Sequence, residues 1–83
     1  MTITPIPPEQ ILFTLAVETA PLTRRQLARA TRLSAGTVRR STEFLVRLGQ
    51  ITEVGKTATR ARLYRVTDKG RRMVELLNTT GVR

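Results

Sequence analysis

The sequence predicts a mainly helical α+β domain with the order helix, helix, helix, strand, strand, helix. Two observations lead to this fold class. Apolar residues recur at helical spacing up to Gly49 and again after Thr67, whereas the segment between them alternates with a period of two. The length of 83 residues allows one domain and is too short for two. We therefore expect one small domain with a single hairpin between its third and last helices.

A first helix is expected from Pro8 to about Thr19, after an irregular lead-in over residues 1–7. Proline suits the first helical position, and Glu9 beside it complements the positive end of the helix. The apolar residues lie on two sides of this helix: Ile11, Leu12, Leu15 and Ala16 on one, Phe13 and Val17 on the other. A helix that is apolar nearly all round is expected to be buried on more than one side, by a partner subunit or by its own chain.

Leu22 and Thr23 are expected to open a second helix over about residues 24–30. Thr23 is a good N-cap, and Gln26 three positions later can return the hydrogen bond to it, which makes a capping box. The small apolar positions of this helix are Leu27, Ala28 and Ala30.

A third helix is expected over residues 35–48, after a turn over residues 31–33. Ser34 is its N-cap and Gly49 ends it. Its core side is expected to hold Val38, Leu45 and Leu48, with Ser41 and Thr42 between them. Its opposite side gathers Gly36, Arg39, Arg40, Glu43 and Arg47, with Phe44 at the edge. This opposite side is strongly cationic.

The segment after the third helix is expected to form a β-hairpin. Residues 51–54 and 62–66 are the strands, with Tyr64 and Val66 facing the core. Residues 55–61 between them are small, polar and basic, as expected of a hairpin tip.

Thr67 is expected to cap a last helix over residues 68–78, with Met73 and Leu77 on its core side, followed by a tail over residues 79–83. The expected domain therefore spans residues 8–78. Two short helices joined by a tight turn and followed by a basic hairpin are typical of a winged helix-turn-helix.

The charge of the chain indicates a polyanionic partner. Thirteen arginines and two lysines stand against six acidic residues, and the net charge is +9. Nucleic acid, an anionic membrane or an acidic protein would suit such a surface. Arginine dominates lysine, and its planar guanidinium group matches phosphates and guanine edges, so nucleic acid is favoured.

Composition argues against other classes of function. The chain has no cysteine or histidine, and its acidic residues are scattered, so we expect no enzyme, no metal and no cofactor. The longest apolar stretch, residues 11–17, is too short to span a bilayer, and no basic residue precedes it as in a secretory signal. We therefore expect a cytoplasmic, nucleoid-associated protein with no membrane contact.

Residues 22–77 resemble the winged helix-turn-helix domain of the MarR-like and PadR-like regulators of bacteria and archaea. Three patterns carry the similarity: Leu22-Thr23-x-x-Gln26-Leu27-Ala28, Leu33-Ser34-x-x-Thr37-Val38-x-Arg40 continuing to Leu45-x-x-x-Gly49-x-Ile51, and Arg62-x-Tyr64-x-Val66-Thr67-Asp68-Lys69-Gly70. The resemblance implies a DNA-binding domain whose third helix is the recognition helix and whose hairpin is the wing. Full members of the MarR-like family have longer flanking helices, which form the dimer and the effector pocket.

The N-terminal half of the recognition helix is expected to read base edges in the major groove. Arg40 is the expected base reader, because arginine can bind guanine with two hydrogen bonds. Arg39 and Arg47 are the other basic residues expected to bind DNA on this helix. Arg39 is expected to contact a base or a phosphate. Gly36 permits close approach to DNA, or serves a local packing need. Glu43 could accept from cytosine, but an ion pair with Arg39 or Arg47 is favoured.

Phosphate contacts are expected at the starts of the two helices of the motif. Arg24 and Arg25 lie in the first turn of the second helix, where guanidinium and backbone N–H groups can meet a phosphate together. Ser34 and Thr37 are expected to touch phosphate or to cap the third helix.

The wing is expected to contact the adjacent minor groove or the DNA backbone through Lys56, Thr57, Arg60 and Arg62. In the free protein, the alternative is a flexible, solvated loop.

We expect a sequence-specific double-stranded DNA-binding transcriptional regulator, a repressor, that acts as a homodimer on two half-sites. Two alternatives remain open. One is an architectural or replication-associated DNA-binding protein of low specificity, and the other is a winged helix that docks an acidic protein.

Overall fold

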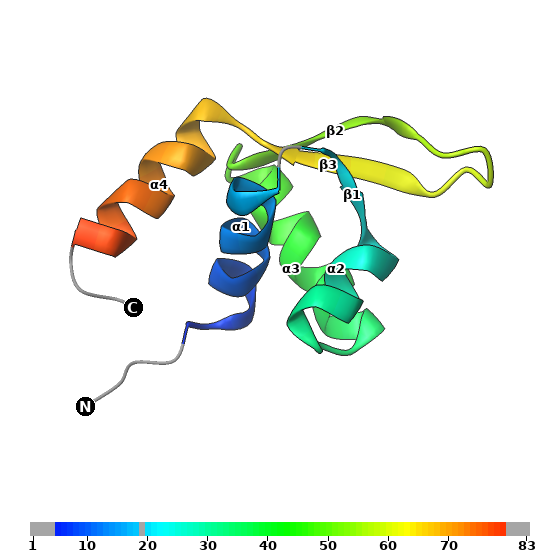
Figure 1. The fold of residues 1–83 in the computed structure, drawn as a ribbon, viewed down its shortest axis with the longest axis horizontal. Helices are drawn as coiled ribbons and strands as arrows, with labels where there is room; N and C mark the ends of the chain where they lie inside the picture. The colour runs from blue at the N-terminus through cyan, green and yellow to red at the C-terminus, as the bar shows by residue number, and fades with distance from the viewer. Residues whose placement is uncertain (1–4, 19, 80–83) are drawn as a thin grey trace.

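The computed structural model describes residues 5–18 and 20–79, which form four helices and one small sheet (Figure 1). The elements are α1 (Pro7–Val17), β1 (Leu22–Thr23), α2 (Arg24–Thr31), α3 (Ala35–Arg47), β2 (Ile51–Lys56), β3 (Arg62–Val66) and α4 (Asp68–Thr79). This is the expected mainly helical α+β fold, a winged helix-turn-helix. The expected lead-in and C-terminal tail lie largely outside the described residues.

The helix boundaries follow from local capping. α1 begins at Pro7, one residue earlier than expected, because the Glu9 carboxylate accepts the Ile6 backbone N–H at 3.0 Å. It ends at Val17, two residues earlier than expected, since Glu18 already has an extended backbone. The predicted capping box of α2 is present, with Thr23 and Gln26 bonded reciprocally at 2.8 and 3.1 Å.

The sheet has a third strand that was not expected. Its strands are antiparallel in the order β1-β3-β2, and β1 pairs Leu22 with Tyr64 and Thr23 with Leu63. Because Leu22 lies in this strand, the prediction that it opens a helix was wrong. A strand of two residues is too short to show an alternation of apolar and polar positions, so the sequence pattern did not indicate it. This pairing ties the start of α2 to the base of the wing.

The wing itself is longer than expected, since β2 continues to Lys56 where we expected Val54. The register shifts between Glu53 and Gly55, and Gly55 has a φ of +154°, so a bulge carries the strand past the glycine. In Figure 1 the hairpin projects from the body on the side away from α4.

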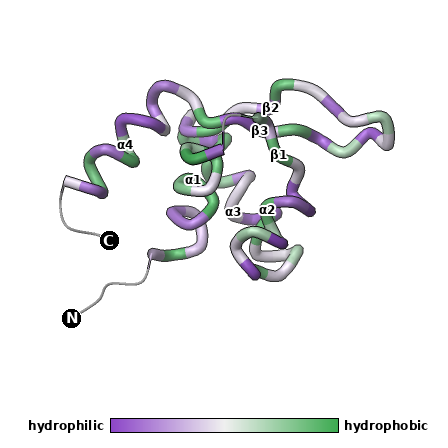
Figure 2. Tube along the Cα trace, in the orientation of Figure 1, coloured by the Kyte–Doolittle hydropathy of each residue, from purple (hydrophilic) through white to green (hydrophobic). Residues whose placement is uncertain are grey.

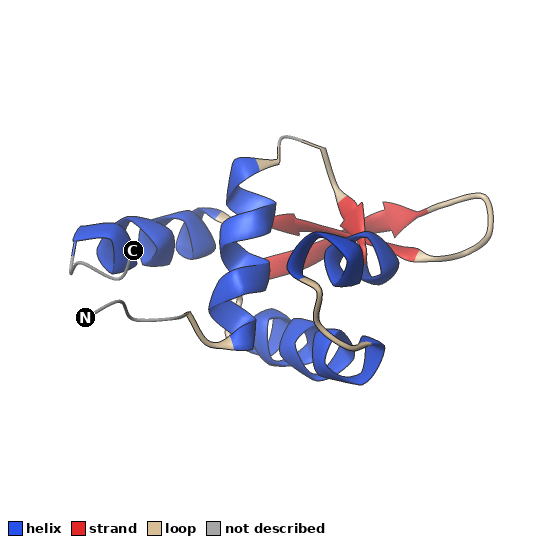
Figure 3. Cartoon of the chain, turned by 60° about the horizontal axis from the view of Figure 1, so that its bottom comes forward, coloured by secondary structure: helices blue, strands red, loops and turns tan. Residues whose placement is uncertain are grey.

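The core forms around α1, which lies between α4 and α2 in Figures 1 and 3 and contacts α2, α3, α4 and β3. The fully or nearly buried apolar side chains are Ile11, Leu12, Leu15, Leu27, Val38, Leu45, Ile51, Tyr64 and Val66. The expected burial of α1 on several sides is thus supplied by its own chain, although Val17 remains 81% exposed. The expectation that Leu48 is a core residue was wrong: its side chain is 38% exposed, because α3 ends at Arg47.

Hydrogen bonds of Thr67 hold the start of α4 against the turn that follows α3. The Thr67 hydroxyl donates to the Gly49 carbonyl at 2.6 Å and accepts the Gly70 backbone N–H at 3.1 Å, and the Thr67 N–H donates to the Gln50 carbonyl at 3.0 Å. Gly70 is buried, and a methyl group there would overlap the Gln50 carbonyl oxygen. The Thr67–Gly70 motif therefore has a structural role: it lets α4 approach the turn that leads into the wing.

Candidate nucleic-acid interface

The turn between α2 and α3 sets the direction of the recognition helix. Arg32 takes a left-handed conformation with φ +60°, and Leu33 follows before the new helix begins. Ser34 caps α3 as expected: its hydroxyl accepts the Thr37 N–H at 3.2 Å and bonds to the Thr37 hydroxyl at 2.9 Å. Capping therefore accounts for both hydroxyl groups in the free protein, and contact of Ser34 or Thr37 with a phosphate stays a prediction.

The outward face of α3 is basic and open. The side chains of Arg39, Arg40 and Arg47 are all exposed, while Val38 and Leu45 hold the opposite face in the core. This arrangement agrees with the predicted division of the helix into a buried side and a cationic side. The face can therefore meet a polyanion without unfolding any part of the domain.

Gly36 lies in the first turn of α3, and its surroundings leave room for a side chain. A methyl group at this position would come no closer than 3.5 Å to a neighbour, the Arg40 guanidinium, which is ordinary van der Waals contact. Its φ is not in the positive region that favours glycine. The described residues therefore show no steric need for glycine at this position, and close approach of Gly36 to DNA stays a prediction.

Glu43 does not form the ion pair that we favoured. Among the described residues, the only ion pair joins Arg62 to Glu53, with 3.6 Å between nitrogen and oxygen. Glu43 is exposed, and its carboxylate stays available on an otherwise basic surface. The intrahelical partners expected for it, Arg39 and Arg47, point their guanidinium groups beyond ion-pair distance.

The wing tip has hydrogen bonds of its own. The Thr57 N–H donates to the Ala61 carbonyl and the Arg60 N–H to the Thr57 carbonyl, both at 2.9 Å, and the Thr57 hydroxyl accepts the Ala61 N–H at 3.1 Å. Arg60 has a φ of +68°, which turns the chain back toward β3. Thr57 therefore closes the loop, while Lys56 and Arg60 remain exposed on it.

Arg62, at the start of β3, forms an ion pair with Glu53 in the free protein. Its side chain is 57% exposed and the Glu53 side chain 38% exposed, so solvent screens the pair and its contribution to stability is small. Contact of Arg62 with a phosphate stays a prediction.

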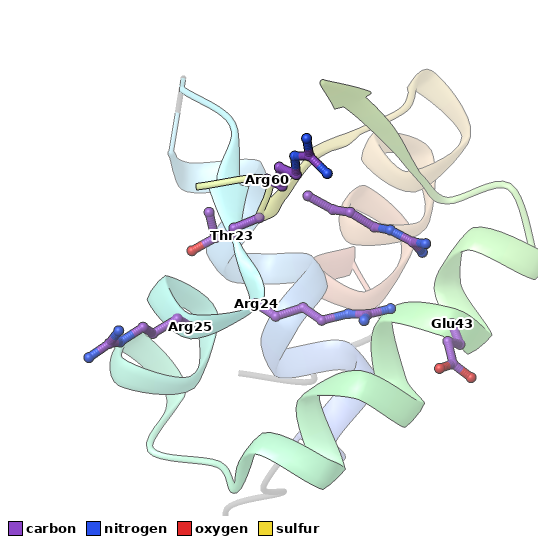
Figure 4. A pocket seen from close by; sticks show the side chains of 7 residues that line it. Thr23, Arg24, Arg25, Glu43 and Arg60 are labelled. Atoms are coloured by element: carbon purple, nitrogen blue, oxygen red, sulfur yellow. The ribbon is translucent and has the colours of Figure 1, made fainter. Parts of the chain in front are cut away.

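Among the predicted contact arginines, Arg24 is the one whose side chain contacts both α3 and β3. Its Nε donates to the Thr42 hydroxyl on α3 at 2.9 Å, and its guanidinium carbon lies 5.4 Å from the centre of the Tyr64 ring on β3. Arg25, its neighbour, is exposed and points in the opposite direction (Figure 4). The hydropathy view shows the strongly hydrophilic start of α2 beside the base of the wing (Figure 2).

An open hollow of about 550 Å³ lies between α2, α3 and the wing. Its lining residues are Thr23, Arg24, Arg25, Glu43, Arg60, Ala61 and Arg62. The sequence places these arginines separately, at a helix start and in a wing, and does not predict that they converge. It also indicates only a core role for Thr42 and Tyr64, because their contacts with Arg24 join segments far apart in the chain.

The described ranges, residues 5–18 and 20–79, contain no group of three or more acidic, histidine or cysteine side chains that could hold a metal ion. None of the helices there is long and apolar enough to cross a membrane.

Solved structures with the same fold include MarR family regulators. A MarR family transcriptional regulator from Silicibacter pomeroyi is 25% identical, with a TM-score of 0.79 over 92% of this chain and 51% of its own. The PcaV transcriptional regulator from Streptomyces coelicolor, solved with its natural ligand, is 27% identical, with a TM-score of 0.80 over 92% of this chain and 54% of its own. A MarR family regulator from Neisseria meningitidis, 24% identical with a TM-score of 0.75, shares the fold over 93% of this chain and 54% of its own.

The chain thus spans about half the length of these solved regulators. No curated protein matches it significantly. The predicted resemblance to MarR-like regulators is confirmed by these structures. A family model described as winged helix-turn-helix DNA-binding matches residues 9–52, more than half of the chain. The chain therefore belongs to the winged helix-turn-helix DNA-binding family.

Proposed function

We propose that this protein is a sequence-specific transcriptional regulator, a repressor, that binds double-stranded DNA without catalysis or cofactor. The observation that carries the proposal is the basic outward face of α3, with Arg39, Arg40 and Arg47 exposed beside a basic wing. In a helix-turn-helix this face enters the major groove. A repressor acts by covering its promoter. A bound domain of this kind can do so by DNA binding alone.

In this proposal α3 supplies the specificity. Arg40 reads a guanine with two hydrogen bonds, and Gly36 lets the helix backbone approach the bases. Glu43, which has no ion pair among the described residues, is free to accept a hydrogen bond from a cytosine amino group. The wing supplies affinity through Lys56 and Arg60 on the minor groove or the backbone.

We further propose that the protein acts as a homodimer. One winged helix contacts few base pairs, so two copies on a near-palindromic site are needed for useful specificity. A groove of about 380 Å³ between α1 and α4 supports this proposal, because the exposed Val17 lines it together with Phe13, Ala16 and Val74, with Arg71, Glu75 and Asn78 completing its wall.

Fluorescence anisotropy tests the proposal directly. Labelled duplexes from the region around the protein's own gene are titrated against scrambled duplexes of equal length, between about 50 and 200 mM salt, where phosphate contacts lose affinity steeply. We expect one fragment to stay bound in the presence of scrambled competitor at the higher salt. Equal binding to both pools that collapses with salt would indicate an architectural protein instead. Absence of binding at low salt would indicate that the basic face docks an acidic protein.

A further inference from the structure

The hollow between α2, α3 and the wing contains one guanidinium group that is positioned in advance. Arg24 lies across the hollow from Arg60, with Glu43 on the α3 side (Figure 4). Its Nε donates to the Thr42 hydroxyl, whose own proton is committed to the Arg39 carbonyl at 2.9 Å. The Thr42 oxygen therefore offers a lone pair to Arg24 and has no alternative donor role. This fixes the direction of the hydrogen bond.

The same guanidinium group lies over the ring of Tyr64. The distance of 5.4 Å from its central carbon to the ring centre is within the range of a cation–π contact. Thr42 is fully buried and Tyr64 is 2% exposed, so both partners belong to the core. Arg24 is thereby attached to α3 and β3 at once, while most surface arginines rotate freely.

The terminal nitrogens of Arg24 remain available. Within the described part of the chain, Arg24 has no hydrogen bond besides that to Thr42 and no ion pair, so its four terminal N–H donors have no protein partner. Planar donors of this kind bind phosphate with two parallel hydrogen bonds. Because the side chain is already ordered, binding would cost little further rotamer entropy.

We propose that this hollow is a phosphate site that receives one phosphodiester group of the DNA backbone, with Arg24 as its fixed ligand and Arg60 closing on it from the wing. Thr42 and Tyr64 are positioning residues for Arg24 and do not touch the DNA. The proposal rests on the DNA-binding function proposed above and adds to it a specific contact. The site links the helix that reads the bases to the wing, so that one phosphate sets the register of both.

The first test neutralises single phosphates. Duplexes of the selected site carry one methylphosphonate at each backbone position in turn, and their affinities for the wild type and for Arg24→Ala are compared. We expect Arg24→Ala to lose about tenfold or more in affinity, the worth of a charge-assisted hydrogen bond. We also expect one methylphosphonate position that weakens the wild type and weakens Arg24→Ala clearly less, because only the Arg60 contact remains to be lost in the variant. Arg72→Ala, which removes an exposed charge on α4, is the matched control and should keep that sensitivity.

The second test addresses positioning. Thr42→Val removes the hydroxyl with little change of volume, and Thr42→Ser retains it. We expect Thr42→Val to weaken DNA binding and to cause no further loss when it is combined with Arg24→Ala. We expect Thr42→Ser, which keeps the hydroxyl, to bind DNA as the wild type does. Arg24→Lys keeps the charge but has no planar group to bond and stack, so we expect it to behave like Arg24→Ala. Thermal unfolding of each variant separates these effects from loss of folding.

The outcomes separate the two proposals. A wild type that binds no duplex would overturn the DNA-binding function and the phosphate site with it. A wild type that binds DNA, with Arg24→Ala equal to Arg72→Ala, would overturn the phosphate site alone. If inorganic phosphate shifts the Arg24 Nε–H resonance while no methylphosphonate position distinguishes Arg24→Ala from the wild type, the site binds a free anion and its assignment to the DNA backbone is wrong.

Discussion

Gly36 and Gly70 both lie in helices, yet their surroundings differ completely. A methyl group at Gly36 would meet only the end of the Arg40 side chain at 3.5 Å. We therefore expect Gly36→Ala to raise the free energy of unfolding by up to about 1 kcal/mol, the helix preference of alanine over glycine. The same methyl group should weaken DNA binding, because it holds the α3 backbone away from the bases. Thermal unfolding and anisotropy measure the two effects, and unchanged affinity would contradict close approach at this position.

Gly70 gives the opposite expectation for the same substitution. A methyl group there would overlap the Gln50 carbonyl oxygen and lie within 2.7 Å of a Val66 methyl carbon. We expect Gly70→Ala to lower the free energy of unfolding by about 1–3 kcal/mol, as for overpacked cores, despite the better helix preference of alanine. Gly36→Ala is its matched control in the same thermal unfolding experiment. Equal changes of the melting temperature in both variants would show that α4 does not need close contact with the Gln50 turn.

At the scale of elements, α3 and the wing should contribute different kinds of binding energy. Lys56 is an exposed cation on the wing, and a contact with the DNA backbone carries no sequence information. Lys56→Ala should therefore weaken binding to all duplexes alike and reduce the slope of log affinity against log salt by about 0.9, the value for one lost phosphate contact. Anisotropy at several salt concentrations measures the slope. A loss confined to one sequence would show that the wing reads bases.

The elements also show what the sequence could and could not predict. Helices α2 and α3, the hairpin and α4 were predictable because caps such as Thr23 and Ser34 mark helix starts and apolar periodicity marks faces. Strand β1 was not, since a strand of two residues exists only through its pairing with β3. The contact of Arg24 with Thr42 escaped for the same reason: it joins residues eighteen positions apart in sequence, and neither residue carries a local signal of the other.

For the whole molecule, the proposed homodimer predicts a sedimentation coefficient that depends on protein concentration and on the residues of the interface. Val17 is 81% exposed beside the groove between α1 and α4, so it should lie in the interface if two copies join there. We expect Val17→Glu to shift sedimentation from dimer to monomer and to weaken binding to a two-half-site duplex, with binding to a single half-site unchanged. Glu18→Lys, next to it on the exposed surface, changes charge without burying a charge in that groove and is the control. A wild type that sediments as a monomer at all concentrations would contradict the dimer.

The central claim, that α3 reads a DNA sequence, is tested most directly by selecting bound duplexes from a randomised pool with the wild type and with Arg40→Ala. We expect the wild type to recover a defined motif and Arg40→Ala to recover the same motif with one base pair relaxed. At that base pair, the variant should lose about 1–3 kcal/mol of discrimination. A wild type that recovers no motif, or a variant that binds more weakly with its motif intact, would contradict the central claim.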